Sequence, residues 1–190
     1  IPHEKCPNGS SEEDNVEVYR KEYKNPKTSL DHVEIGEKID SINFDDATKV
    51  AGPRFVVLKD KLAQMHRALI QLMLDEAMKN NYQECYVPHI VNSNSLFGTG
   101  QLPKFADDSF KVENEEKYLI PTAEVPLTNL FRDKQLAVDE LPVMVTAHTP
   151  CYRSEAGSYG KDTRGMIRQH QFEKVELVQI VHPSLSLIHI

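Results

Sequence analysis

The sequence runs Pro150-Cys-Tyr-Arg153-Ser-Glu155, continues through the glycine-containing loop 156–166 and enters Arg168-Gln-His-Gln-Phe172-Glu-Lys-Val-Glu176. Cys151–Glu155 and Gln169–Val181 have the composition of strands, and the loop is short enough for them to pair as neighbours. Alternate residues of a strand share a face. That face carries His170, Phe172, Lys174, Glu176 and Val178 on the second strand, and Arg153 and Glu155 on the first. One sheet surface is therefore expected to combine arginine, carboxylates and an aromatic ring.

This polar face has two interpretations. The first is a solvated sheet surface with cross-strand ion pairs, which is common in antiparallel sheets. The second is a site for an anion, because the face includes an aromatic residue and the loop adds Lys161 and Arg164 to its three glycines. The sequence contains no P-loop motif, so side chains would have to hold a phosphate.

The segments before this stretch predict a mixed fold. Apolar residues that recur every three or four positions indicate a long amphipathic helix: Leu58, Leu62, Met65, Leu69, Leu72 and Met73. Further strands are expected at Tyr82–Val87, which Pro88 ends, at Lys117–Ile120 and at Val143–Ala147. Thr122 predicts the N-cap of a helix with Pro126 in its first turn. We expect an α+β domain in which helices flank an antiparallel β-sheet.

The ends of the chain differ from its centre. The first fifty residues contain 12 Asp and Glu against 7 Lys and Arg, together with turn-forming residues. We expect residues 1–50 to be a loop-rich, partly ordered lead-in and residues 51–183 to form the core. Residues 184–190 are expected to be a non-native tail, because Leu185–Ile190 is what one reading frame of a common sequencing adapter encodes. The alternative is an ordinary apolar strand.

Composition excludes several classes of protein. A chain of 190 residues with 39% hydrophobic residues can bury one core. The net charge of −7 argues against a nucleic-acid surface over the whole chain, because phosphates require clustered Lys and Arg. Cys6, Cys85 and Cys151 are widely spaced and predict no disulfide. His148 and Cys151 have a spacing seen in metal sites, but no second pair of ligands accompanies them, so we predict no metal site. Without a membrane span or signal peptide, the chain is expected in the cytoplasm.

Residues 150–176 resemble motif 2 of the class II aminoacyl-tRNA synthetases in its seryl form. The helix that leads into Tyr82–Pro88 resembles motif 1, whose proline ends a strand at the dimer interface in this class. Gly98–Phe105 and Ile120–Pro126 are similar to further segments of the seryl enzymes, as is the lead-in. The resemblance covers residues 1 to about 183, and it implies a partial class II core that forms a homodimer through the helix and strand ending at Pro88.

Seryl-tRNA synthetases join L-serine to ATP, giving seryl-adenylate and pyrophosphate, and then pass serine to tRNA(Ser). The resemblance implies that Arg153 is the catalytic residue and bridges α-phosphate oxygens. It implies ATP binding by Arg153, Ser154, Glu155 and Phe172, and serine binding by Thr122, Ala123, Glu124 and Glu176. The carboxylate of serine is already ionised at pH 7, so its attack on phosphorus needs no general base.

Each of these roles has a structural alternative. The alternatives are a helix N-cap for Thr122, a first-turn acid for Glu124, a core position for Phe172, and an ion pair with Lys174 or Arg168 for Glu176. A sequence pattern alone does not separate these alternatives from the roles in binding.

The resemblance also implies parts that we expect outside this chain. These are the coiled-coil arm that grips tRNA, and motif 3 with a second arginine and a carboxylate that helps to place Mg²⁺. We therefore predict that the chain alone is inactive or weakly active. Two other functions are possible: a ligase that loads an amino acid onto a carrier protein, and a non-catalytic dimerisation module. The presence of Arg153, Glu155 and Glu176 argues against the second.

Overall fold

The computed structural model describes residues 8–22, 30–156 and 164–185. The expectations for Cys6, Lys161 and residues 186–190 lie outside these described residues. Within them, no helix combines the length and the apolar character needed to cross a membrane. Short 3₁₀ turns occur at Glu12–Asp14, Ala106–Asp108, Val138–Glu140 and Pro183–Leu185.

The centre of the fold is a pair of long antiparallel strands. β6 (Val143–Tyr152) pairs with β7 (Gln171–Ile180) along its whole length. The pairing predicted from the sequence is confirmed. β3 (Gln83–Glu84) lies parallel to β6 on its other edge, so the sheet order is β3–β6–β7. The strand expected at Tyr82–Val87 is thus reduced to β3.

β6 differs from the prediction because it continues through Pro150. The backbone N–H of Tyr152 points away from β7 and donates to the carbonyl of Ile120 at 2.9 Å. Pro150 lies two residues earlier and faces the same way, so its missing N–H removes no hydrogen bond to β7. The strands expected at 143–147 and 151–155 are therefore one strand, which ends at Tyr152.

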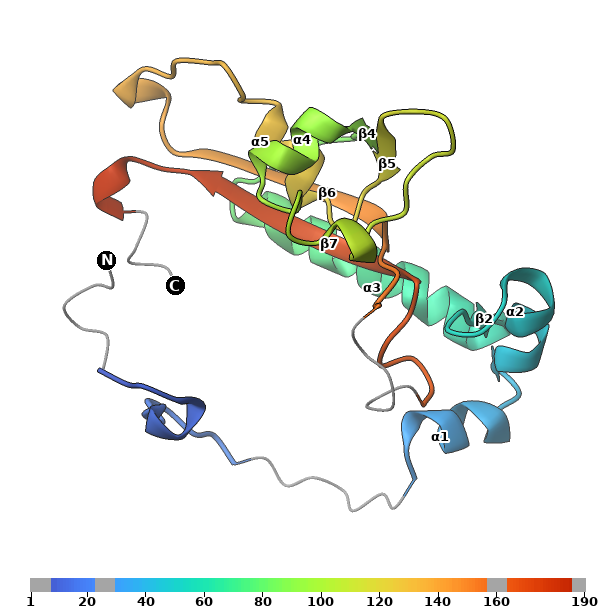
Figure 1. Ribbon diagram of the computed structural model, residues 1–190. Coiled ribbons are helices and arrows are strands. Elements are labelled where there is room, and N and C mark those ends of the chain that lie inside the picture. The colour runs from blue at the N-terminus through green and yellow to red at the C-terminus, as the bar shows by residue number, and fades with distance from the viewer. Residues whose placement is uncertain (1–7, 23–29, 157–163, 186–190) are drawn as a thin grey trace.

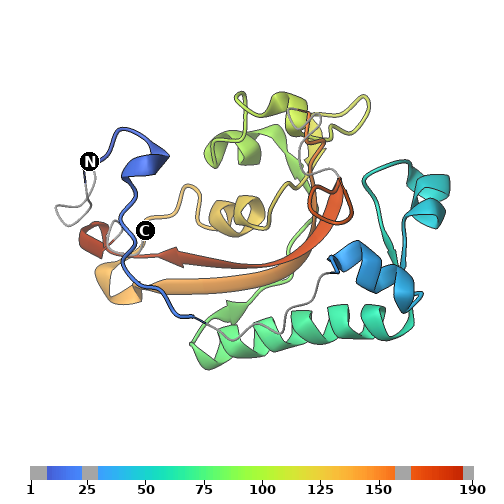
Figure 2. The same cartoon turned by 90° about the horizontal axis from the view of Figure 1, so that it is seen from below.

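The two faces of this sheet are covered by different helices (Figure 1). α3 (Asp60–Lys79) packs on one face, and α5 (Glu124–Asn129) packs on the other, with α4 (Ser93–Gly98) against α5 (Figure 2). The first apolar cluster, between α5 and β6, consists of Val87, Ala123, Leu127, Val145 and Ala147. The second, between α5 and the ladder of β4 (Ile90–Asn92) with β5 (Lys117–Leu119), consists of Val91, Leu96, Leu102, Ile120 and Val125. α5 therefore joins both clusters.

The start of α5 corrects one prediction in detail. The helix expected after Thr122 is confirmed, and Pro126 lies in its first turn. The N-cap is Ala123 rather than Thr122, and no side chain caps the helix. The Thr122 hydroxyl accepts from the N–H of Glu124 at 3.4 Å, which is a long contact. Thr122 is therefore available for another partner.

α3 confirms the predicted helix from Asp60 onward, whereas Leu58, expected in the same stripe, lies in β2 (Val57–Leu58). The apolar stripe of α3 stays largely exposed. The exposed fractions are 52% for Met65, 47% for Leu69, 54% for Leu72 and 46% for Met73. The buried residues of α3 are instead Leu74 and Ala77, near its C-terminal end. The stripe thus forms an apolar surface of the single chain.

From Asp31 onward the lead-in is more regular than its loop-rich composition indicates. α1 (His32–Lys38), β1 (Ile42–Asn43) and α2 (Phe44–Ala51) form there, and β1 pairs with β2 (Val57–Leu58). Asp31 caps α1 with Glu34 as its capping-box partner, and Asn43 caps α2. These caps are readable in the sequence as Asp or Asn at the start of a short helix.

Candidate functional site

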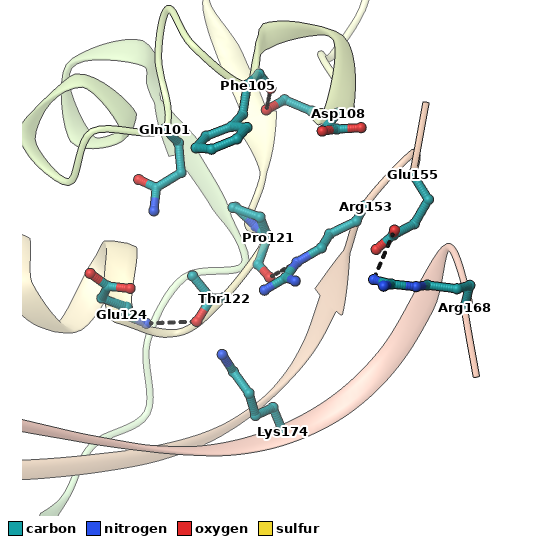
Figure 3. Close-up of a pocket in the computed structure, with 11 residues that line it drawn as sticks. Gln101, Phe105, Asp108, Pro121, Thr122, Glu124, Arg153, Glu155, Arg168 and Lys174 are labelled. Atoms are coloured by element: carbon teal, nitrogen blue, oxygen red, sulfur yellow. Dashed lines mark hydrogen bonds and ion pairs between the residues drawn. The ribbon is translucent and has the colours of Figure 1, made fainter. Parts of the chain in front are cut away.

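A cavity of about 330 Å³ opens where β6 ends and α5 begins (Figure 3). Its lining consists of Gln101, Phe105, Asp108, Ser109, Pro121, Thr122, Glu124, Arg153, Glu155, Arg168 and Lys174. The lining side chains come from segments far apart in the sequence, and Figure 3 shows Arg168 and Glu155 at one end and Thr122 and Glu124 toward the other. The cavity therefore has two chemically distinct ends around Arg153.

Arg153 is fixed at the centre by contacts on several sides. It is the first residue after β6, and its backbone N–H donates to the carbonyl of His170 at 3.0 Å. Its Nε donates to the carbonyl of Pro121 at 3.2 Å. Its guanidinium carbon lies 5.2 Å from the centre of the Phe172 ring, a cation–π contact. These contacts hold the guanidinium in one orientation, with its remaining N–H groups toward the cavity.

Glu155 reaches the cavity by a different route from the one predicted. The sequence placed it on one strand face with Arg153, but the strand ends at Tyr152 and Glu155 has a φ of 50°. Its carbonyl accepts from Arg54 Nη1 at 3.1 Å, and its Oε2 lies 3.5 Å from Arg168 Nη1. Its side chain is mostly buried. A turn held by Arg54, and not strand alternation, therefore directs this carboxylate.

Ser154 and Phe172 are not part of the cavity lining, and Phe172 lines a second, neighbouring cavity instead. The Ser154 hydroxyl donates to the carbonyl of Asp107 at 2.5 Å, and its N–H donates to the carbonyl of Asp108 at 3.0 Å. These bonds tie the turn 153–155 to the 3₁₀ turn Ala106–Asp108. Phe172 lies at the half-buried start of β7 and contacts the site through Arg153.

The predicted serine ligands lie together at the other end. The Thr122 hydroxyl donates to Glu176 Oε2, and Lys174 Nζ lies 2.6 Å from the same oxygen. Burial raises the pKa of Glu176, but hydrogen bonds from Lys174 and Thr122, together with the charges of Lys174 and Arg153, outweigh burial, so its pKa lies below the ordinary value. Glu176 is therefore ionised at neutral pH. It lies behind Thr122 and Lys174, outside the cavity lining.

Ala123 and Glu124 face opposite ways at the start of α5. Ala123 is fully buried in the cluster with Leu127, so its side chain points into the core. Glu124 is exposed and lines the cavity. The structure thus brings Thr122, Glu124 and Arg153 to one cavity, with Glu176 directly behind it.

Several lining residues were not expected as ligands. From the sequence, Lys174 and Arg168 were considered only as ion-pair partners of Glu176. Strand alternation could have indicated Lys174, because it shares the predicted face of Glu176. Gln101 and Asp108 come from a loop region without periodicity, and no spacing in the sequence indicates them. Arg153, Arg168 and Lys174, together with Asp108, Glu124 and Glu155, give the lining both signs of charge. Such a lining suits a ligand that has both anionic and cationic groups.

The residues weighed as metal ligands lie apart from the cavity. His148 Nε2 and Glu173 Oε2 approach to 2.8 Å without the alignment of a hydrogen bond, and Cys151 is fully buried. Burial raises the pKa of the Cys151 thiol, which keeps it protonated. Among residues 8–22, 30–156 and 164–185, no group of three or more His, Cys, Asp or Glu could hold a metal ion.

Residues 108–188 match the family model described as the tRNA synthetase class II core domain (G, H, P, S and T). The fold and the cavity between β6 and α5 thus belong to a class II aminoacyl-tRNA synthetase core. Over 98% of its length the chain is 56% identical to the serine–tRNA ligase of Herminiimonas arsenicoxydans. The chain belongs to the seryl-tRNA synthetase family, and it spans 45% of the length of that relative.

Solved structures agree with this assignment. The cytoplasmic serine–tRNA ligase of Naegleria fowleri in complex with AMP superposes with a TM-score of 0.84 and 31% identity, over 96% of this chain and 44% of that one. The seryl-tRNA synthetase of Pyrococcus horikoshii complexed with ATP superposes with a TM-score of 0.78 and 37% identity, over 82% of this chain and 35% of that one. The α+β fold predicted from the sequence is confirmed.

Proposed function

We propose that the protein activates L-serine with ATP to form seryl-adenylate and pyrophosphate, and that it then transfers serine to tRNA(Ser). The observation that carries this proposal is the arrangement of charges in one cavity, with Arg153 at the centre, Glu155 at one end and Glu124 with Thr122 at the other. The similar proteins described above are named as serine–tRNA ligases, and two of their structures hold AMP or ATP. The reaction implies a place in the cytoplasm.

ATP is proposed to bind at the end formed by Glu155 and Arg168, with Phe172 beside it across Arg153. The adenine amino group would donate to the Glu155 carboxylate, and the ring would stack on Phe172. Arg153 would bridge the α-phosphate and follow its charge into the transition state, which its fixed orientation makes effective. Ser154 would contribute by holding the turn 153–155, because its hydroxyl is engaged with the carbonyl of Asp107.

Serine is proposed to bind at the end formed by Thr122 and Glu124. The Glu124 and Glu176 carboxylates would accept from its ammonium and hydroxyl groups, while Ala123 would contribute through its backbone, since its side chain lies in the core. A pocket whose polar groups stay unpaired with the wrong amino acid discriminates strongly. The protein's contribution to the reaction is then orientation of the serine carboxylate toward the α-phosphorus.

Mg²⁺ would accompany ATP as part of the substrate. The described residues contain no acidic or histidine cluster that fits a metal ion, so no step is assigned to it here.

A second part of the proposal is a homodimer formed through α3 and the segment that ends at Pro88. It is supported by the exposed apolar stripe of α3, because an apolar surface on a helix is stabilised when a second copy covers it. Sedimentation velocity tests it. A chain that sediments as a monomer at micromolar concentration would contradict this part and leave the catalytic proposal standing.

The catalytic proposal is tested by serine-dependent exchange of pyrophosphate into ATP in the complete protein that carries this chain. Exchange should require L-serine, and Arg153→Ala should lower it about 100-fold or more, as for other preorganised groups that stabilise charge. Arg132→Ala is the matched control, since Arg132 lies near the exposed Asp133, outside the cavity lining. Exchange without serine, or an equal loss in both variants, would refute the proposal.

Two further outcomes separate the alternatives. Serine activation followed by loading of a carrier protein, and not of tRNA, would favour the carrier-protein ligase. The chain alone should exchange weakly or not at all, as predicted from the sequence. Turnover close to that of a complete relative would contradict this last prediction.

A further inference from the structure

The beginning of α1 contacts the segment that leads into β7. The backbone N–H of Met166 donates to His32 Nε2 at 2.9 Å, across 134 residues of sequence. Arg164 Nη1 forms an ion pair with Asp31 Oδ2. In Figure 1 the chain between residue 163 and β7 reaches down to α1, away from the sheet. The start of α1 thus holds residues 164–166, which lead into β7.

Gly165 shows that this contact is closely fitted. Its φ is 69°, a conformation that favours glycine. A Cβ added there would lie 2.2 Å from His32 Nε2 and 2.6 Å from Val33 Cγ2. Because any larger residue would push the segment off α1, the backbone of residue 165 fits against His32 and Val33 only as glycine.

Asp31 divides its two oxygens between two functions. Oδ1 accepts from the backbone N–H groups of Val33 at 2.9 Å and Glu34 at 3.0 Å, which caps α1. Oδ2 is the atom that meets Arg164. The same side chain therefore stabilises the first turn of α1 and attaches the loop segment to it, so His32 is presented from an ordered helix end.

The segment held by His32 continues directly into the cavity. Two residues after Met166, Arg168 lines the cavity and lies 3.5 Å from Glu155. Two residues further, the N–H of His170 donates to the carbonyl of Arg54 at 3.0 Å. Arg168 thus lies between two attachment points, one on α1 and one on the segment before β2.

We propose that His32 is a positioning residue for the ATP end of the cavity, acting through Met166 on the placement of Arg168 and Glu155. This inference rests on the proposed function for its ATP end, and on the contacts above for its geometry. His32 touches no lining residue of the serine end. Its loss should therefore weaken ATP binding and leave serine binding unchanged.

Three variants of the complete protein test this. His32→Ala removes the acceptor of the Met166 N–H. His32→Gln keeps an acceptor at similar reach and should restore function, and Glu37→Gln, on an exposed side of α1, is the control. In His32→Ala we expect faster hydrogen exchange in peptides covering residues 164–170, and ATP binding about three- to tenfold weaker by calorimetry, the range for one lost hydrogen bond. Serine binding should match the control.

The outcomes are decisive in both directions. Unchanged exchange in residues 164–170 of His32→Ala, equal losses of ATP and serine affinity, or a His32→Gln variant no better than His32→Ala would overturn the inference. If the unaltered protein binds no ATP, the proposed function is wrong, and so is the predicted effect of His32 on ATP binding. Hydrogen exchange still decides whether His32 holds residues 164–170.

Discussion

Truncation of Leu127 should weaken the support of α5, the helix that carries the proposed serine end. Leu127 is fully buried on α5, in the cluster with Val87, Ala123, Val145 and Ala147. Leu→Ala at such a site removes the transfer free energy of the side chain and leaves a cavity, at a total cost of about 2–5 kcal/mol. Since Ala123 and Ala147 are too small to fill the space, we expect a loss of about 3–4 kcal/mol in the free energy of unfolding.

Urea unfolding followed by circular dichroism measures this loss in free energy, and thermal unfolding measures the corresponding change in melting temperature. For a domain of this size the melting temperature should fall by about 6–16 °C, at about 2–4 °C per kcal/mol. Leu130→Ala is the matched control, because Leu130 follows directly after α5 and is 43% exposed. The reasoning is refuted if Leu127→Ala costs less than about 1 kcal/mol, or no more than Leu130→Ala.

Three further predictions concern other parts of the molecule. Gly36→Ala would place a Cβ 2.4 Å from Ile42 Cδ1, so it should lower the free energy of unfolding by about 1–3 kcal/mol, and an unchanged urea midpoint would contradict that. The pKa of Glu176 lies below its ordinary value, so its stabilising contribution is present above about pH 4.5 and is lost as pH falls through the folded-state pKa. Glu176→Gln should therefore flatten the fall in melting temperature at acid pH, and a profile identical to that of the unaltered protein would contradict this. Met65→Glu combined with Leu69→Glu should convert the proposed dimer to monomer in sedimentation velocity, and a persistent dimer would move the interface elsewhere.

Periodicity made the central elements predictable. α3 and the pair of β6 with β7 repeat their patterns over many residues, and tertiary contacts only shorten or extend them by a few positions. β6 was predicted as two strands, 143–147 and 151–155, although it runs unbroken through Pro150. The N–H position of Pro150 faces away from β7, and this orientation depends on register, which the local sequence does not specify.

The helices of the lead-in were not predicted individually, for a different reason. α1 and α2 are short, and their stability comes from the Asp31 and Asn43 caps and from the packing of buried Val33 and Ile42, not from a long apolar stripe. Charge composition indicated loops, because the polar residues of a surface helix and of a loop are alike. The capping residues carried the information that composition obscured.

The candidate site was predictable where a strand determines the direction of a side chain. Lys174 and Glu176 share a face of β7 as alternation requires, and their ion pair follows from it. Glu155 was not predictable in this way, because its direction comes from a φ of 50° and from Arg54, which lies 101 residues earlier. Asp108 and Gln101 enter the lining through tertiary contacts of irregular segments, which no spacing describes.

The two ends of the cavity thus depend on different parts of the chain. At the proposed serine end, α5 buries Ala123 and Leu127 and exposes Glu124. The two residues that anchor the helix and the residue that faces the cavity thus lie on different sides of the same helical turn. At the ATP end, Arg168 depends on α1 and on Arg54, with no shared contact to Leu127. Because changes at sites without shared partners are additive, a core truncation on α5 and a loss of His32 should combine without coupling. The proposed serine end and the proposed ATP end are therefore supported separately, by α5 and by α1, although Arg153 lies between them.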